Sequence, residues 1–120
     1  KAIELNPRFA QAYTNRGISY IRIGKEDLSH KDFSKAIEIS PRFSIPYLNR
    51  AILNKKRNYL YEAKEDLDFF IKINSNYPTA FFERANVKIK LKDIKGAKKD
   101  LVKAFDLGYK EAKLELEKLS

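Results

Sequence analysis

The 120-residue sequence contains no cysteine, methionine or tryptophan. Without cysteine the chain can form neither a disulfide framework nor a thiolate site for a metal. Glycine and proline are scarce, at four residues each, which disfavours an all-β fold rich in turns. No apolar run approaches the roughly 18 residues that a membrane-spanning helix requires. The remaining composition, 43% hydrophobic and 34% charged, is typical of one globular domain.

Charge is unbalanced, with 25 Lys and Arg against 16 Asp and Glu and a net charge of +9. A basic surface can bind nucleic acid, an anionic membrane surface or an acidic protein, so charge alone does not select a partner. The single histidine, His30, has no HExxH motif, cysteine or spaced carboxylate near it, and the sequence lacks a Gly-rich phosphate loop. We therefore interpret His30 as a surface residue and expect no enzyme, no metal site and no other cofactor.

The most informative feature of the sequence is a repetition with a period of 34 residues. KAIELNPRF at 1–9 and KAIEISPRF at 35–43 agree at seven of nine positions. The match continues without a gap, since KDFSKAIEI at 31–39 aligns with EDLDFFIKI at 65–73 and KDLVKAFDL at 99–107. A period of roughly 20 to 50 residues is typical of proteins built from stacked repeats.

Each repeat has the pattern of two helices joined by a short loop. In the first segment, four residues recur at helical spacing and predict one apolar face: Phe9, Tyr13, Gly17 and Tyr20. Gly24 then interrupts the pattern, and a second apolar face ends before Pro41, because the residue preceding a proline disfavours helical geometry. The register predicts helix pairs at 9–22 and 26–39, 43–56 and 60–73, and 77–90 and 94–107.

An arginine and an aspartate recur 16 residues apart in every repeat. The pairs are Arg16 and Asp32, Arg50 and Asp66, and Arg84 and Asp100. Their midpoints are residues 24, 58 and 92, which fall in the predicted loops, so the partners face each other if the two helices are antiparallel. We expect these pairs to be structural and to fix the register of each hairpin.

Small residues also recur in register where the paired helices should approach most closely. On the first helices they are Gly17, Ala51 and Ala85, and on the second helices Ser29, Ala63 and Ala97. A larger side chain at these positions would overpack the crossing, at a cost of roughly 1–3 kcal/mol.

With these residues the chain resembles a tetratricopeptide repeat (TPR) protein over essentially its whole length. The matching residues are Tyr13, Gly17, Tyr20, Ser29, Phe33, Ala36 and Pro41 in the first unit; Tyr47, Ala51, Ala63 and Leu67 in the second; and Phe81, Ala85, Ala97, Leu101 and Ala104 in the third. The second and third units depart from the pattern, because Ser75 and Tyr109 replace the terminal proline. The resemblance implies an all-α fold, an α-solenoid of stacked antiparallel helix pairs that forms a TPR superhelix.

The register divides the chain into the end of a preceding TPR helix with its turn at 1–7, TPR units at 8–41, 42–75 and 76–109, and a C-terminal capping helix at 110–120. Gly108 is placed to end the last hairpin. Ala112, Leu116 and Leu119 then predict the apolar face of the capping helix. No comparable cap precedes the first unit, so we expect a fragment of a larger protein whose N-terminal end could self-associate weakly.

By resemblance to TPR proteins, the first helix of each pair lines a concave groove. The predicted groove residues are Gln11, Thr14, Ile18, Ile21, Arg22, Ile45, Leu48, Asn49, Ile52, Lys55, Lys56, Thr79, Phe82, Asn86, Ile89 and Lys90. Ile45, Leu48 and Ile52 recur at helical spacing and predict, with Ile18 and Phe82, an exposed apolar strip that would bind a partner. The alternative is that these residues pack between neighbouring first helices.

A row of cations lies beside the apolar strip. Arg22, Lys56 and Lys90 share one position in the three units, and Lys55 is adjacent to it. Such a row suits an acidic, partly apolar peptide, whose docking the charges would accelerate and orient. A solvated rim is the alternative interpretation.

We therefore expect a protein–protein interaction scaffold that binds a peptide segment in its groove. Some TPR proteins bind the C-terminal carboxylate of chaperones with a clamp of two Lys, two Asn and one Arg. The corresponding positions here hold Thr14, Ile18, Asn49, Thr79 and Glu83. Because only Asn49 matches, we expect that this chain is not a clamp of that type.

Two alternatives to peptide binding are carried forward. One is a basic α-solenoid that binds RNA or another polyanion through Lys95, Lys98, Lys99 and Lys103, which share one face of the last second helix. This face has no interleaved aromatic residue for base stacking, so nucleic acid is the weaker expectation. The other alternative is a self-association module.

Overall fold

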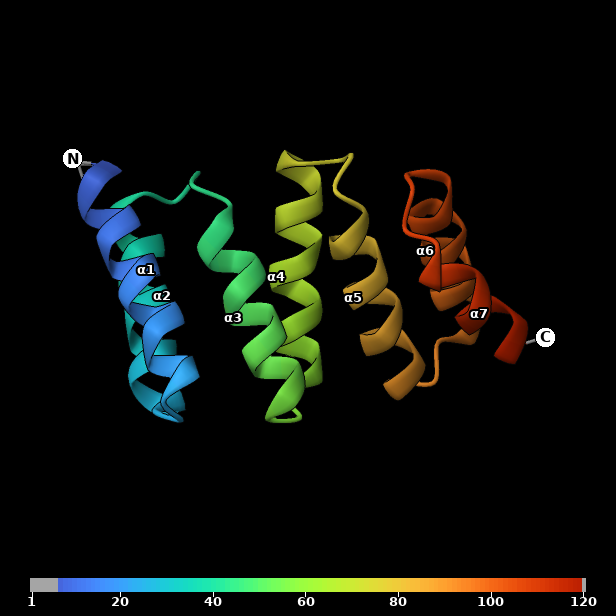
Figure 1. Cartoon of the computed structure of the whole chain (residues 1–120), viewed down its shortest axis with the longest axis horizontal. Coiled ribbons are helices and arrows are strands. Elements are labelled where there is room, and N and C mark those ends of the chain that lie inside the picture. The colour runs from blue at the N-terminus through green and yellow to red at the C-terminus, as the bar shows by residue number, and fades with distance from the viewer. Residues whose placement is uncertain (1–6, 120) are drawn as a thin grey trace.

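The computed structural model describes residues 7–119, which form seven α-helices and no strand. The helices are α1 (Pro7–Arg22), α2 (Glu26–Ile39), α3 (Ile45–Lys56), α4 (Leu60–Ile73), α5 (Pro78–Lys90), α6 (Ile94–Asp106) and α7 (Glu111–Lys118). They follow one another along the long axis, with α1 at one end of the molecule and α7 at the other (Figure 1). In this described part of the chain, no helix is long and apolar enough to cross a lipid bilayer.

The predicted helix pairs are confirmed, with every boundary within two residues of its expected position. A helix is also present at Glu111–Lys118, inside the predicted capping segment. The preceding helix end expected at 1–7 lies outside the described residues except for Pro7, which begins α1. The division into units at 8–41, 42–75 and 76–109 stays a prediction.

One residue with a positive φ angle closes each hairpin. Gly24, Asn58 and Lys92 have φ angles of 78°, 67° and 71°, and they are the midpoints that the register predicted. The backbone N–H of the following residue donates over 2.8 Å to a carbonyl in the last turn of the first helix, from Lys25 to Tyr20, Tyr59 to Asn54, and Asp93 to Lys88. Equal turn geometry gives the three hairpins the same register.

The helices α1, α3 and α5 contact one another in sequence. Each helix packs against the next along the chain, and α1 also contacts α3, as α3 contacts α5. Among the described residues, the second helices α2, α4 and α6 make less contact with one another. Helices that converge occupy the concave side of a curved stack, so these contacts agree with a groove on the side of α1, α3 and α5, which stays a prediction.

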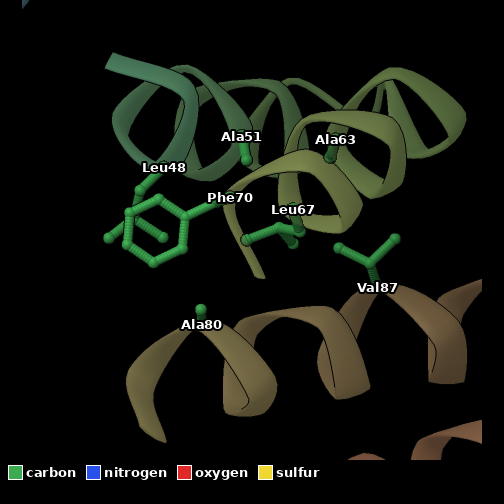
Figure 2. Packing of buried hydrophobic residues seen from close by; sticks show 7 residues of the cluster. All are labelled: Leu48, Ala51, Ala63, Leu67, Phe70, Ala80 and Val87. Atoms are coloured by element: carbon green, nitrogen blue, oxygen red, sulfur yellow. The ribbon is translucent and has the colours of Figure 1, made fainter. Parts of the chain in front are cut away.

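The described core cluster with the most buried residues joins one helix pair to the next. It comprises Leu48, Ala51, Ala63, Leu67, Phe70, Ala80 and Val87, drawn from α3, α4 and α5 (Figure 2). Side chains of α5 complete a core that α3 and α4 begin, as expected where stacked repeats share a continuous core. The small residues predicted at the helix crossings are all buried: Gly17, Ser29, Ala51, Ala63, Ala85 and Ala97.

The buried face of α1 differs from the prediction by one position. Phe9 was expected in the apolar face, but it is 56% exposed. The buried residues of α1 are Ala10, Thr14 and Gly17. Ala10 contacts the cluster formed with Ala36 and Ile39, so the small residue packs against α2 and the large one faces solvent.

Candidate functional site

All three Arg–Asp pairs predicted from the sequence form in the structure. In each, the arginine Nε lies 2.8 Å from one carboxylate oxygen and a second guanidinium nitrogen lies 2.8–2.9 Å from the other: Arg16 with Asp32, Arg50 with Asp66, and Arg84 with Asp100. The aspartates are buried, and hydrogen bonding to them raises the pKa of each arginine. Such two-point pairing holds the antiparallel helices in register.

Two of these arginines also join neighbouring repeats. Arg50 donates to Ser34 Oγ over 3.1 Å, and Arg84 donates to Asp68 Oδ1 over 2.9 Å. Both acceptors lie on the second helix of the preceding pair. The guanidinium groups of Arg50 and Arg84 are therefore occupied by structural contacts on both sides.

The sixteen predicted groove residues fall into three classes of exposure. Those exposed are Gln11, Arg22, Ile45, Ile52, Lys56 and Lys90. Those half-buried are Ile18, Ile21, Asn49, Lys55, Thr79, Phe82, Asn86 and Ile89. Those buried are Thr14 and Leu48.

Leu48 and Thr14 correct the predicted groove. Leu48 is only 7% exposed and belongs to the core cluster with Phe70 and Ala80, so its placement in an exposed strip was wrong. Packing between neighbouring helices is the right interpretation for this residue. Thr14 is 2% exposed, and its hydroxyl donates to the Ala10 carbonyl over 2.8 Å. Neither side chain presents a surface to a partner.

The apolar surface that remains is centred on α3. Ile45 and Ile52 are each 36% exposed, and they lie two helical turns apart, about 10 Å along the axis. Phe82 on α5 is half-buried because its ring packs on Tyr109, with ring centroids 4.6 Å apart. The strip is therefore shorter than predicted and is confined chiefly to one helix.

Two of the four predicted cations are neutralised. Lys55 Nζ lies 2.6 Å from Glu83 Oε1 on α5, and Lys56 Nζ lies 2.5 Å from Glu26 Oε2 on α2. Within residues 7–119, neither Arg22 nor Lys90 has an ion pair. The row of cations is thus interrupted at its centre and positive at its two ends.

The acidic partners Glu83 and Glu26 were not predicted from the sequence. Glu83 was considered only as a mismatch to a chaperone clamp. The sequence did contain a signal for these pairs, because Lys55 and Glu83 are 28 residues apart and Glu26 and Lys56 are 30 residues apart. Both spacings are shorter than the 34-residue repeat, because each contact joins different register positions of two helices.

A cavity of about 810 Å3 lies beside α2 and contains none of the predicted groove residues. Its charged lining is largely self-paired: Arg16 with Asp32, Lys35 with Glu38, and Arg57 with Asp27. A ligand there would have to break existing ion pairs. The described residues include no group of three or more His, Cys, Asp or Glu that could hold a metal ion.

His30 lines this cavity and is half-buried rather than on the open surface as predicted. Burial lowers its pKa below the ordinary value, and the positive charges of Arg50 and Arg57 lower it further. The imidazole is therefore neutral at pH 7. A neutral group surrounded by paired charges offers little attraction to a charged ligand.

Comparisons with known proteins agree with this architecture. A family model described as tetratricopeptide repeat matches residues 1–31. No curated protein matches the sequence. Among solved structures, the first TPR domain of Spaghetti (RPAP3), bound to the HSP90 peptide SRMEEVD, has a TM-score of 0.92 at 24% identity, over 97% of this chain and 94% of that one.

Two human structures are similar at slightly higher identity. The second TPR domain of human RPAP3, in complex with the HSP70 peptide SGPTIEEVD, has a TM-score of 0.87 at 26% identity, covering 95% of this chain and 98% of that one. The first TPR domain of the same human protein has a TM-score of 0.87 at 25% identity, covering 95% and 91%. With the 34-residue period and the helix pairs described above, these matches support the assignment of the chain to the tetratricopeptide repeat family.

Proposed function

We propose that this chain is a protein-interaction scaffold that binds a peptide segment of another protein in the groove lined by α1, α3 and α5. The observation that supports the proposal is the apolar surface of Ile45 and Ile52 on α3, each of which remains 36% exposed. A ligand that covers these two isoleucines gains hydrophobic contact.

The solved relatives support this proposal. One was determined with the peptide SRMEEVD and another with SGPTIEEVD, and both share the stacked helix pairs of this chain. The positive ends of the groove at Arg22 and Lys90 suit acidic residues of a ligand, as the sequence predicted, and the isoleucines suit apolar ones.

The proposal is tested by selecting ligands from a phage-displayed library of random peptides. The selected peptides are then titrated against the wild-type chain, an Ile45→Asp/Ile52→Asp variant and a Tyr61→Asp control. Tyr61 lies on α4 and is 72% exposed, so the control carries a similar surface change outside the groove. We expect the double variant to lose at least tenfold in affinity and the control to retain it, which corresponds to about 1.4 kcal/mol or more. Peptides that bind all three proteins equally would contradict groove binding.

A second candidate function concerns the outward face of α6. Lys95, Lys98, Lys99 and Lys103 are exposed and have no ion pair within the described part of the chain. The corresponding faces of the earlier second helices contain ion pairs, Lys64 with Asp68 on α4 and Lys35 with Glu38 on α2. This surplus of charge favours a polyanion. Polyuridine RNA is a suitable probe, and affinity that falls steeply with salt and is lost in a variant with all four lysines changed to glutamine would support the proposal.

A further inference from the structure

One ion pair links α3 to α5, two of the three helices expected to line the groove. Lys55 Nζ lies 2.6 Å from Glu83 Oε1, and the side chains are only 23% and 17% exposed. At the corresponding positions 34 residues earlier the chain has Ile21 and Asn49, which cannot form an ion pair. A pair required for stacking would recur in each unit, as the Arg–Asp pairs do. The Lys55–Glu83 pair therefore sets a local property of the groove rather than a general property of the fold.

An uncharged side chain lies about one helical turn from each partner of this ion pair. Ile52 on α3 remains 36% exposed, and Asn86, one turn after Glu83 on α5, is half-buried. Phe82, the residue before Glu83, packs its ring on that of Tyr109, with ring centroids 4.6 Å apart. Burial and then the carboxylates of Glu111 and Glu83 raise the pKa of the Tyr109 phenol. The region around the pair thus combines the apolar surface of Ile52, the carboxamide of Asn86 and the phenol of Tyr109. The ion pair itself carries no net charge.

We propose that Glu83 is a specificity-determining residue that makes the centre of the groove select an uncharged, partly apolar stretch of peptide. This inference rests on the proposed function. A ligand carboxylate placed at the centre would lie beside Glu83 and would have to compete with it for Lys55, and the repulsion is strong where the groups are partly buried. An uncharged segment meets no such repulsion and packs on Ile52. Acidic residues of the ligand then lie at the ends of the groove, near Arg22 or Lys90.

The same pair could instead serve only to hold α3 against α5. These roles differ in what they predict for Glu83→Gln, which removes the negative charge but keeps the length of the side chain. A purely structural pair, once broken, changes stability and weakens all ligands alike. A specificity-determining carboxylate, once neutralised, changes which ligands bind.

The experiment is a parallel selection from a phage-displayed library of random peptides. The targets are the wild-type chain, Glu83→Gln and the double variant Lys55→Gln/Glu83→Gln. Glu26→Gln is the matched control, because it also frees a lysine at the groove, Lys56, but one that is 67% exposed. Glu83→Asn serves as a second variant in case Glu83→Gln folds poorly. Far-UV circular dichroism establishes that each protein is helical, and peptides are kept only if Ile45→Asp/Ile52→Asp abolishes their binding.

We expect the wild-type chain to select peptides with an uncharged central stretch and Glu83→Gln to select peptides rich in Asp and Glu there. For acidic peptides taken from the second set, fluorescence anisotropy should show an affinity for Glu83→Gln about tenfold higher than for the wild type, as expected when a partly buried like charge is removed. The gain should disappear in the double variant, and Glu26→Gln should gain less than about threefold, because exposed charges are well screened.

The possible outcomes separate the two ideas. If groove-dependent peptides are recovered but their acid content is the same for wild type and Glu83→Gln, the role of Glu83 is refuted while the proposed function stands. The same holds if the wild type already selects acidic central stretches. If no recovered peptide depends on the groove, the proposed function itself fails, and the inference about Glu83 fails with it.

Discussion

The close contact between α1 and α2 at Gly17 predicts the effect of adding one carbon atom there. Gly17 is buried on α1 against the ring of Phe33, which is fully buried on α2. A Cβ atom built on Gly17 would lie 2.6 Å from Phe33 Cε1 and 2.9 Å from Cδ1, well inside van der Waals contact. In the later units the same two positions hold Ala51 with Leu67, and an alanine is tolerated where its partner is smaller. Gly17 and Phe33 are therefore a size-matched pair.

Gly17→Ala should destabilise the chain even though alanine is the better helix former. Overpacking a core typically costs about 1–3 kcal/mol. Alanine in place of a mid-helix glycine recovers about 0.5–1 kcal/mol of backbone entropy. We expect a net loss of about 1–2 kcal/mol in the free energy of unfolding. Urea titration followed by far-UV circular dichroism measures this loss as a lower transition midpoint.

Phe33→Leu supplies the test of the reasoning. Alone, it should also destabilise, by about 1–2 kcal/mol, because it leaves a cavity beside Gly17. Combined with Gly17→Ala, it recreates the pair found in the later units, so the double variant should be more stable than the sum of the single changes predicts. We expect a favourable coupling of about 1–3 kcal/mol. Additive single effects, or a Gly17→Ala variant as stable as the wild type, would refute the size-matching argument.

Three further predictions concern single residues. Lys92→Gly should raise the free energy of unfolding by about 0.5–1 kcal/mol in a urea titration, because relief of the left-handed φ angle of 71° gains about 1–2 kcal/mol and the backbone entropy of glycine offsets about 0.5–1 kcal/mol of it; an unchanged midpoint would contradict it. Asn54→Leu should raise it by about 1 kcal/mol, because Asn54 Oδ1 is buried without a hydrogen-bond partner in the described part of the chain; a clear loss would show that the amide is needed. Burial, and then the positive charges of Arg50 and Arg57, lower the pKa of His30 in the folded chain. As the pH drops below about 6.5, His30 is therefore protonated in the unfolded chain before it is protonated in the folded chain, and the free energy of unfolding should fall. His30→Gln should flatten thermal stability between pH 7 and pH 5, and an unchanged pH profile would rule out this contribution.

The fold could be predicted almost completely from the sequence, because each of its constraints recurs every 34 residues. The offset of 16 residues between Arg50 and Asp66 located the hairpin loop, and the structure places Asn58 there with a positive φ angle. The repetition makes each helix assignment more certain, because an error in one unit would have to occur in the same way in all three units. Phe9 shows where this averaging fails, because at the end of the described stack no earlier described helix packs against it.

The candidate groove was less predictable, because register places a residue on a face without showing what approaches that face. Leu48 and Ile52 lie one turn apart on α3, yet the first packs against Phe70 and Ala80 while the second remains 36% exposed. The difference in exposure between Leu48 and Ile52 depends on how α4 and α5 pack against α3. The spacing of apolar residues along one helix does not show this. The ion pair of Lys55 and Glu83 was missed for the same reason.

The distinction between recurring and non-recurring positions also separates stability from specificity in this chain. Positions whose chemistry recurs, such as Arg84 and Asp100 with their counterparts, bind helix to helix and leave little for a ligand. Positions whose chemistry changes from unit to unit are not needed for this packing of helix on helix. The clearest example is the pair of positions that holds Ile21 and Asn49 in one unit interface and Lys55 and Glu83 in the next. If stacking alone had shaped the groove, these positions would resemble one another. Their difference, at the centre of the concave face, is the reason to expect that the choice of ligand is made there.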